Sequence, residues 1–336
     1  MARESKVADH RSRHEPERQV LLMEGRLSLP RRLEAFESCR HELVALSYRM
    51  LGDLGRAEDM VQEAWLRWQD YEGEVESSRA FLVTVVTRLC LNELSSARAR
   101  REENRPDRLP EPVDLDGGGI ARVERLEQLS MAVLVALQRL TPAERAVLLL
   151  HDVFDFGHQE IAELVGNTAV ACRKLLERAR RSLATERRMQ STSQEEHRRL
   201  LEAFLQAATG GDIQGVVQLL AENAIMVTDG GAEGRRFAGQ RNLPQPMQGA
   251  ARIAAFVVAT TRRTAGVLRV EEHQLNGQPA AVFWNGEQPF AALLLGIAHG
   301  KVQRVYFHAD LDRLSRVGRQ VDTGLNLLRL WPSPRE

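Results

Sequence analysis

The stretch Gly157-His158-Gln159-Glu160-Ile161-Ala162-Glu163-Leu164-Val165-Gly166, followed by residues 167–183, has the pattern of two helices joined by a tight glycine turn. An apolar stripe in the first helix leads to Gly166, a residue suited to the left-handed conformation that ends a helix. Apolar residues in the second helix have the spacing of a buried seam, at Cys172, Leu175, Leu176, Ala179 and Leu183. Such a pair is typical of DNA-binding proteins, in which the second helix enters the major groove.

The other face of the second helix is strongly basic. Arg173 and Lys174 lie one turn into the helix, where side chains that read bases usually lie. Arg178, Arg180 and Arg181 are better placed for phosphates, which supply affinity but little sequence information. Glu177 suits a cytosine amino group, or an ion pair with Arg173 or Arg181 at helical spacing. The alternative for the whole face is an ordinary solvated surface.

Composition limits the classes of protein that the chain can represent. Its 336 residues suffice for two or three domains, and its formal charge is zero, so DNA binding must come from local patches. Cys39, Cys90 and Cys172 lie far apart, which argues against disulfides and a structural zinc site. The longest apolar run, at residues 291–298, is too short to span a bilayer. We expect a cytoplasmic protein without a membrane partner, cofactor or metal.

The first 101 residues are expected to form a tail and a helical domain. Residues 1–30 are charged and lack periodicity, so a disordered tail is predicted. Apolar spacing predicts three helices in a domain at residues 31–101, namely residues 33–50, 56–70 and 79–101.

Two polar surfaces in this domain are candidate binding sites. Asp59, Gln62 and Glu63 form, with Glu58, an acidic stripe that suits a basic partner helix, although a solvated helix face is the simpler interpretation. The third helix suits melted DNA or, as the alternative, is a core element with a basic end. Its candidate contacts to phosphates or an unstacked base are Arg79, Arg88 and Asn92.

A linker and a second helical domain follow. Prolines and glycines at residues 102–121 are incompatible with a helix and predict an interdomain linker. Helical pattern resumes at residues 123–140, and Thr141-Pro142-Ala143-Glu144 is a good start for the next helix. The domain at residues 122–188 therefore contains the helix-turn-helix, with a hinge expected at residues 184–194.

Residues 195–316 predict a separate α+β domain. Two amphipathic helices, a short strand at residues 224–228 and a helix at residues 248–261 precede a run of antiparallel strands. Asn276-Gly277 and Asn285-Gly286 lie between apolar runs and are strong hairpin signals. Residues 317–336 are a tail.

Four side chains in this domain are candidates for proton transfer: Asp229, His273, His299 and His308. They show no catalytic spacing, and a single histidine on a strand is usually structural. Asp229-Gly230-Gly231 is better interpreted as a turn after the short strand. No catalytic residue is therefore assigned.

The order of these motifs resembles the extracytoplasmic-function family of bacterial RNA polymerase sigma factors. Residues 56–65 are similar to the helix that contacts polymerase, and residues 79–94 to the helix that melts the promoter. Residues 140–145 and 160–180 are similar to the family's second conserved domain. The resemblance implies that core RNA polymerase and promoter DNA are the partners, and that the helix-turn-helix reads the minus-thirty-five duplex.

The C-terminal domain resembles the SnoaL-like domain fused to the SigJ-type subgroup. The similar segments are residues 200–205, Gly211-Asp212, residues 229–231 and Asn276-Gly277. The resemblance implies a cone-shaped sheet with a pocket, and regulation in cis through contacts between the linker at Leu109-Pro110 and Asp229-Gly230-Gly231. The chain departs from the subgroup pattern at Arg108, at Ala232 and at residues 309–314, all at positions where these parts are expected to touch.

The sequence thus predicts a multi-domain protein with two all-α sigma domains and a C-terminal α+β cone. Its expected function is that of an alternative sigma factor, with a small molecule in the pocket as a candidate ligand. One alternative is a SnoaL-like enzyme fused to a DNA-binding domain. Another is a conventional regulator that uses the helix-turn-helix alone, which would not need the acidic stripe.

Overall fold

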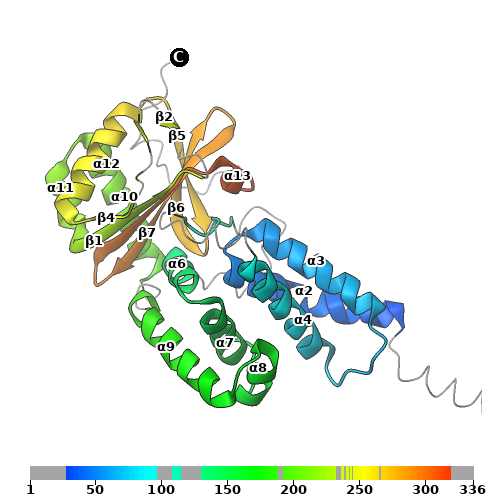
Figure 1. Ribbon diagram of the computed structural model, residues 1–336. Coiled ribbons are helices and arrows are strands. Elements are labelled where there is room, and N and C mark those ends of the chain that lie inside the picture. The colour runs from blue at the N-terminus through cyan, green and yellow to red at the C-terminus, as the bar shows by residue number, and fades with distance from the viewer. Residues whose placement is uncertain are drawn as a thin grey trace, which may run out of the picture.

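The computed structural model contains two groups of helices and one domain built on a sheet (Figure 1). It describes residues 28–96, 108–114, 130–187, 192–231, 236–237, 240–241, 243, 245–264 and 266–318. The predicted tails up to residue 27 and after residue 318, the predicted linker at residues 102–107 and 115–121, and the departure from the subgroup pattern at Ala232 fall outside these ranges.

The first group is a bundle of three helices, α2 (Leu29–Leu51), α3 (Leu54–Asp70) and α4 (Ser78–Ser95). Helix α2 starts within the predicted tail, because Pro30 occupies its first turn, where proline is favourable. Helix α4 ends at Ser95, earlier than the predicted residue 101. The Ser95 hydroxyl donates to the carbonyl of Asn92 at 2.8 Å, a local bond of the kind that competes with helix continuation.

The second group comprises α6 (Met131–Arg139), α7 (Pro142–Asp152), α8 (His158–Val165) and α9 (Ala169–Arg187). The predicted start of α7 is confirmed, since Thr141 and Glu144 form a reciprocal capping box. The glycine turn is confirmed as well, because Gly166 has φ of +67° and ends α8. The apolar seam of α9 is buried, apart from the half-buried Leu175.

The C-terminal domain has a six-stranded sheet of order β4-β1-β8-β7-β6-β5. Its strands are β1 (Leu220–Asp229), β4 (Met247–Gln248), β5 (Arg269–Leu275), β6 (Gln278–Asn285), β7 (Gln288–Ala298) and β8 (Lys301–His308). A separate ribbon pairs β2 (Arg236–Phe237) with β3 (Gln240–Arg241). The helices are α10 (Gln194–Gly210), α11 (Ile213–Leu219), α12 (Ala250–Thr264) and α13 (Leu311–Leu314). The predicted α+β class is confirmed.

The first strand is longer than predicted, and its pairing was not predicted. It starts at Leu220 and not at residue 224, and it pairs with β8 in parallel, so the sheet is mixed. The parallel direction is possible because α12 and six further strands lie between β1 and β8 along the chain. Strands β5 to β8 form the expected antiparallel run.

Tight turns join these antiparallel strands. Asn276 and Gly277 both have positive φ, +53° and +67°, as a two-residue type I′ hairpin turn requires. Gly286 also has positive φ, at +59°, in the next turn. Both predicted hairpins are therefore confirmed.

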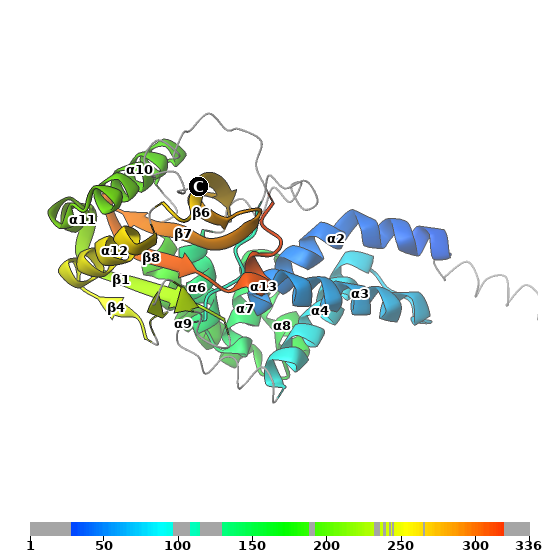
Figure 2. The same ribbon diagram turned by 90° about the horizontal axis from the view of Figure 1, so that it is seen from above.

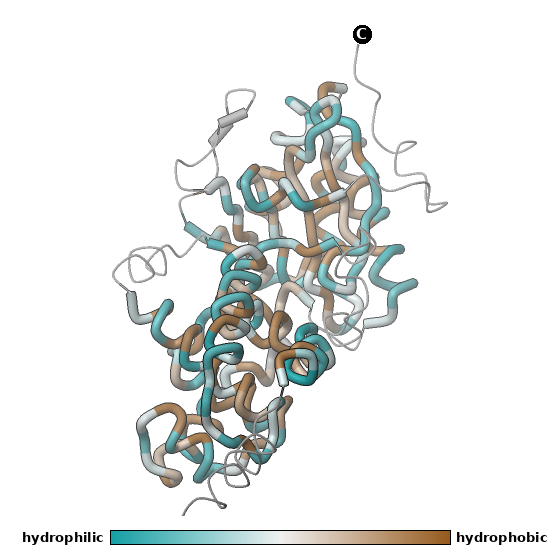
Figure 3. Tube along the Cα trace, turned by 90° about the vertical axis from the view of Figure 1, so that its right-hand side faces the viewer, coloured by the Kyte–Doolittle hydropathy of each residue, from teal (hydrophilic) through white to brown (hydrophobic). Residues whose placement is uncertain are grey.

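The two faces of the sheet pack against different parts of the chain. Along β8, Val305 packs with α10, α11 and α12, whereas Tyr306 points to the opposite side. That opposite face receives Leu109 from the linker and Met131, Ala132 and Val135 from α6. Figures 1 and 2 show α10–α12 on one side of the sheet and α6 on the other. Figure 3 shows hydrophobic stretches running through both the sheet and the helical groups.

Helix α6 lies between the sheet and the first bundle. Its residues 131–137 are all buried. Leu134 and Leu137 belong to the apolar core that α2–α4 share with α7–α9, while Met131 and Val135 belong to the core under the sheet. No helix in the described ranges has both the length and the apolar character needed to cross a membrane.

Candidate nucleic-acid and polymerase interfaces

The exposed face of α9 carries the predicted base-reading residues. The Thr168 hydroxyl accepts from the Ala171 backbone N–H at 3.2 Å and so caps the start of the helix. Further along, four of the predicted side chains are exposed and form no hydrogen bond or ion pair with any other residue that the structure describes: Arg173, Lys174, Glu177 and Arg181. The alternative pairing of Glu177 with its neighbours is thus not observed, and the face is available to a ligand.

Two further arginines fasten α9 to α7. Arg178, a predicted phosphate contact, pairs with Glu144 at 2.8 Å between Nη2 and Oε1. Arg180 pairs with Asp152 at 2.5 Å between Nη2 and Oδ1. These pairs lie at the two ends of α7 and fix the angle at which α9 is presented. The phosphate roles of Arg178 and Arg180 remain predictions.

The structure separates the three residues predicted to bind melted DNA. Arg88 and Asn92 are exposed near the C-terminal end of α4. Arg79 lies nine residues before Arg88, which at 100° per residue places it on the opposite side of the helix. There it pairs with Glu42 at 2.7 Å and lies over the ring of Phe154 at 5.3 Å, at the contact between the two helical groups.

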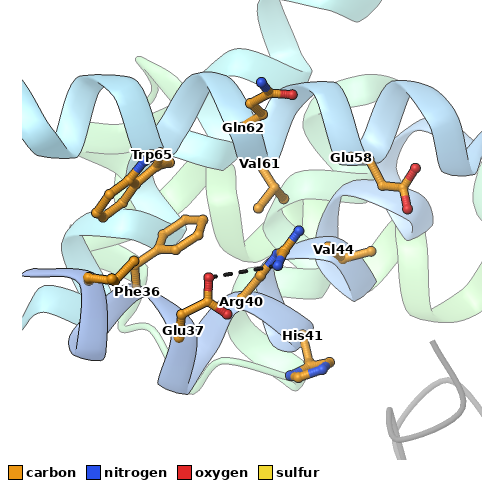
Figure 4. Close-up of a pocket in the computed structure, with 10 residues that line it drawn as sticks. Phe36, Glu37, Arg40, His41, Val44, Glu58, Val61, Gln62 and Trp65 are labelled. Atoms are coloured by element: carbon orange, nitrogen blue, oxygen red, sulfur yellow. Dashed lines mark ion pairs between the residues drawn. The ribbon is translucent and has the colours of Figure 1, made fainter. Parts of the chain in front are cut away.

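A groove lies between α2 and α3, beside the acidic stripe (Figure 4). It encloses about 530 Å³, and Phe36 and Trp65 line it with ring centroids 4.9 Å apart. Glu58 and Gln62 are one turn apart on α3 and border the same groove. The site thus combines an apolar floor with polar edges.

The other two acidic candidates lie near this groove but do not line it. Asp59 is exposed, whereas Glu63 is half-buried and pairs with Arg67 at 3.0 Å between Oε1 and Nε. Of the three predicted polymerase contacts, only Gln62 belongs to the groove itself.

Residues 108–114, which we call the linker segment, are held by the sheet domain. Asp229 accepts the Leu109 backbone N–H at 2.9 Å with Oδ2 and the Gly231 N–H at 3.0 Å with Oδ1. Arg313 of α13 donates to the carbonyl of Leu109. The structure therefore brings together the predicted pair Leu109 and Asp229, with Pro110 buried beside them.

The hairpin turn at Asn276 holds the other end of the linker segment. Asn276 donates its backbone N–H to the carbonyl of Val113 at 2.9 Å and accepts the Val113 N–H on its side chain at 3.2 Å. Its side-chain amide also donates to the hydroxyl of Tyr48 on α2 at 2.8 Å. Tyr48 in turn donates to the carbonyl of Glu111 at 2.6 Å, so one buried network joins the bundle, the linker segment and the sheet domain.

The side chain of Glu111 fastens the linker segment to α3. Its Oε2 accepts the backbone N–H of Leu54 at 2.7 Å, at the start of the helix, where a negative charge is favourable. Burial raises the pKa of this carboxyl group, while the Leu54 N–H partly opposes the shift. Next to it, Arg316 pairs with Glu58 of the acidic stripe at 2.8 Å. The sheet domain thus reaches the edge of the α2–α3 groove.

Comparison with known proteins identifies these helical groups. The Sigma-70 region 2 family model matches residues 35–100, and the Sigma-70 region 4 model matches residues 130–183. The probable ECF RNA polymerase sigma factor SigI of Mycobacterium tuberculosis is 32% identical over 276 residues, which cover 81% of this chain and 91% of the relative. The chain belongs to the extracytoplasmic-function sigma factor family. Sigma factors of this family direct RNA polymerase to promoters.

The similarity of this sigma factor extends into its C-terminal domain. The ECF RNA polymerase sigma factor SigJ of M. tuberculosis is 34% identical over 232 residues, or 68% of this chain and 72% of the relative. The crystal structure of M. tuberculosis SigJ has a TM-score of 0.64 and 27% identity, and covers 84% of this chain and 97% of that chain. The predicted combination of two sigma domains and a C-terminal α+β domain is confirmed.

Of the four proton-transfer candidates of the sigma factor, Asp229 and His273 contact the linker segment. Asp229 and His308 are register partners on β1 and β8, both are buried, and burial lowers the pKa of His308 to about 4. Buried His273 lies 3.3 Å from Asp114 of the linker segment, between Nδ1 and Oδ2. His299 lies in an exposed turn with φ of +54°.

Several residues that hold the domains together were missed from the sequence. Tyr48 lies within the predicted helix at residues 33–50, but its role was not predicted, and neither were the roles of Glu111, Arg313 and Arg316. Arg313 lies within the segment that departs from the subgroup pattern, and Arg316 follows it. Arg313 nevertheless contacts the linker segment, and Arg316 contacts α3. No local signal marks these residues, because their partners are more than 50 positions away in the chain.

Proposed function

We propose that this sigma factor reads promoter duplex with the exposed face of α9, binds melted DNA at Arg88 and Asn92, and binds core polymerase at the α2–α3 groove. We further propose that its C-terminal domain acts as a brake in cis. One observation supports the brake. Helix α6 and the linker segment both lie between the first bundle and the sheet, and both contact each of them.

The duplex-reading role rests on two cationic side chains that have no ion-pair partner among the described residues. Arg173 and Lys174 project from the first turns of α9 without an internal partner, at positions from which a recognition helix reaches base edges. Because the whole chain carries no net charge, a local cluster must supply the attraction to DNA.

The polymerase-binding role rests on the chemistry of the groove. Phe36 and Trp65 offer an apolar floor that an amphipathic helix of a partner can cover. Gln62 and Glu58 on the rim, with exposed Asp59 nearby, favour a basic partner surface. The pairing of Glu58 with Arg316 gives the sheet domain direct access to that rim.

The brake acts on the relative position of the two sigma domains. Reading a duplex element and a melted element together requires each domain to reach its own part of the promoter. Helix α6 cannot move away from α2 or from the sheet without exposing Met131, Leu134, Val135 and Leu137 to water. Exposed apolar surface costs about 25 cal/mol per Å², so this exposure opposes separation of the two sigma domains. We therefore expect release of the C-terminal domain to raise activity.

The duplex-reading assignment is tested by run-off transcription with core polymerase on a promoter library. We expect the double variant Arg173→Ala/Lys174→Ala to lose promoter-specific transcription while still co-purifying with polymerase. The double variant Arg262→Ala/Arg263→Ala, which removes two adjacent exposed arginines from α12, is the matched control. Equal transcription by the two double variants would contradict the assignment.

The brake is tested with Asp229→Ala, which removes the acceptor of the Leu109 N–H. A buried donor left without its partner costs about 1–3 kcal/mol, so the linker segment loosens. We expect promoter-specific transcription to rise several-fold. Asp212→Ala is the control, because Asp212 caps α11 within the same domain and does not touch the linker segment. Unchanged or reduced transcription in Asp229→Ala, relative to Asp212→Ala, would refute the brake.

A further inference from the structure

The first turn of α9 carries an apolar side chain among the proposed DNA contacts. Val170 is 58% exposed, one of few large apolar side chains left open to solvent in the described parts of the chain. It lies two residues after Thr168, which caps the helix. The inference drawn from Val170 rests on the proposed duplex-reading role of α9.

Helical geometry places Val170 in the centre of the reading face. At 100° per residue, Arg173, Lys174, Glu177 and Arg181 all lie within about 60° of Val170 around the helix axis. The buried positions Cys172, Leu176, Ala179 and Leu183 lie on the opposite side. Val170 therefore faces the same ligand as the polar residues that follow it, and none of the apolar cores includes it.

We infer that Val170 contacts the C5-methyl group of a thymine in the upstream duplex element. In the major groove only thymine presents a methyl group, and small apolar side chains recognise it by direct contact. The N-terminal residues of a recognition helix are those that contact base edges. The valine side chain has essentially one rotamer in a helix, so little conformational entropy is lost when it is fixed against a base.

The side chains on this face of α9 suit different chemical groups on neighbouring bases. Arg173 and Lys174 present donors suited to guanine, one turn further along α9 than Val170. The helix therefore reads a thymine methyl next to a base pair recognised by hydrogen bonds. Hydrogen-bonding side chains alone do not distinguish thymine from uracil, whereas a methyl contact does.

The test removes one methyl group at a time from the DNA. Duplexes bound by the full chain with core polymerase are first selected from a random library, and each thymine of the selected element is then replaced by deoxyuridine. We expect one replacement to weaken binding by holoenzyme about fourfold, the effect of about 0.8 kcal/mol for one buried methyl group. Holoenzyme with Val170→Ala should bind the thymine and deoxyuridine duplexes equally.

Val267→Ala is the matched control, because Val267 is 49% exposed and belongs to the sheet domain. It should show the same response to deoxyuridine as the unchanged chain. If Val170→Ala weakens binding below detection, Val170→Thr, which keeps one methyl group, is measured in its place and should show a reduced response.

Two outcomes overturn the inference: no thymine position is sensitive to deoxyuridine, or the Val170 variants are as sensitive as the unchanged chain. Either result leaves duplex reading by α9 intact, provided that Arg173→Ala/Lys174→Ala still abolishes selection of specific sequences. If that double variant selects the same sequences as the unchanged chain, the proposed function itself fails.

Discussion

At the scale of single residues, Arg145 joins the two sigma domains through backbone carbonyl groups. It is fully buried and donates to the backbone carbonyls of Leu137, Gln138 and Leu140 at 2.8–3.1 Å, and to that of Met50. These carbonyls lie at the C-terminal ends of α6 and α2, where a helix lacks internal donors and where a positive charge is favourable. One guanidinium group thus satisfies two helix ends and ties them together.

We expect Arg145→Met to lower the free energy of unfolding by about 3 kcal/mol or more. Methionine replaces the aliphatic part of the side chain but leaves several buried carbonyl groups without donors, at about 1–3 kcal/mol for each unsatisfied group. Urea unfolding followed by circular dichroism measures the change. Arg181→Met is the control, since Arg181 is exposed on α9 and should change stability by less than about 0.5 kcal/mol. Similar losses in the two variants would show that the Arg145 network is dispensable.

At the scale of elements, features with local causes were predictable from the residues themselves, whereas the distant contact between Leu109 and Asp229 was expected only from the resemblance to the subgroup. The turn at Gly166 and the capping box at Thr141 were predicted because each depends on residues a few positions apart. The Asn276 turn was predicted for the same reason. Its bonds to Val113 and Tyr48 were not, because no pattern in the sequence relates residues more than 160 positions apart.

Helix α6 did carry a signal that sequence reasoning left unused. Residues 131–137 are apolar on every side, which is typical of a helix that is buried all round. The interpretation as one helix among several in its domain did not account for this. In the structure the two apolar sides face two different partners, the shared sigma core and the sheet.

The linker also has a feature that its composition does not predict, namely its burial. Its prolines predicted a segment without helix, and residues 108–114 indeed contain no helix. Composition alone suggested a spacer, but Leu109, Glu111 and Val113 are buried. Their burial depends on acceptors and donors supplied by Asp229, Asn276 and α3, which only the assembled fold brings near.

At the scale of the whole molecule, the C-terminal domain, which we propose to be a clamp on the sigma domains, contains two buried histidines. His197 on α10 and His308 on β8 have pKa values lowered to about 4 by burial, from the usual 6.5. Around His308, Asp229 opposes the shift and Arg313 adds to it. Neither imidazole is satisfied on all its nitrogens by the described residues, so protonation is not compensated in the folded state.

We therefore expect acid to loosen the clamp before it loosens the sigma domains. Below pH 6.5 the unfolded domain binds protons that the folded domain does not, so stability falls as the pH drops from about 6.5 towards 4. At pH 5 the loss is about 2 kcal/mol for each histidine. Hydrogen exchange at pH 7.5 and 5, corrected for intrinsic rates, should show the loss of protection in β1 and β5–β8 and little change in α2–α4.

The double variant His197→Phe/His308→Phe separates this effect from general acid sensitivity. Phenylalanine fills a similar volume and does not titrate, and the unpartnered ring nitrogens make an apolar replacement acceptable. The double variant should keep its protection in the sheet at pH 5. His299→Asn, which preserves a residue tolerant of positive φ in an exposed turn, should behave like the unchanged chain. Equal loss of protection in all three proteins would mean that other groups control the response of the clamp to acid.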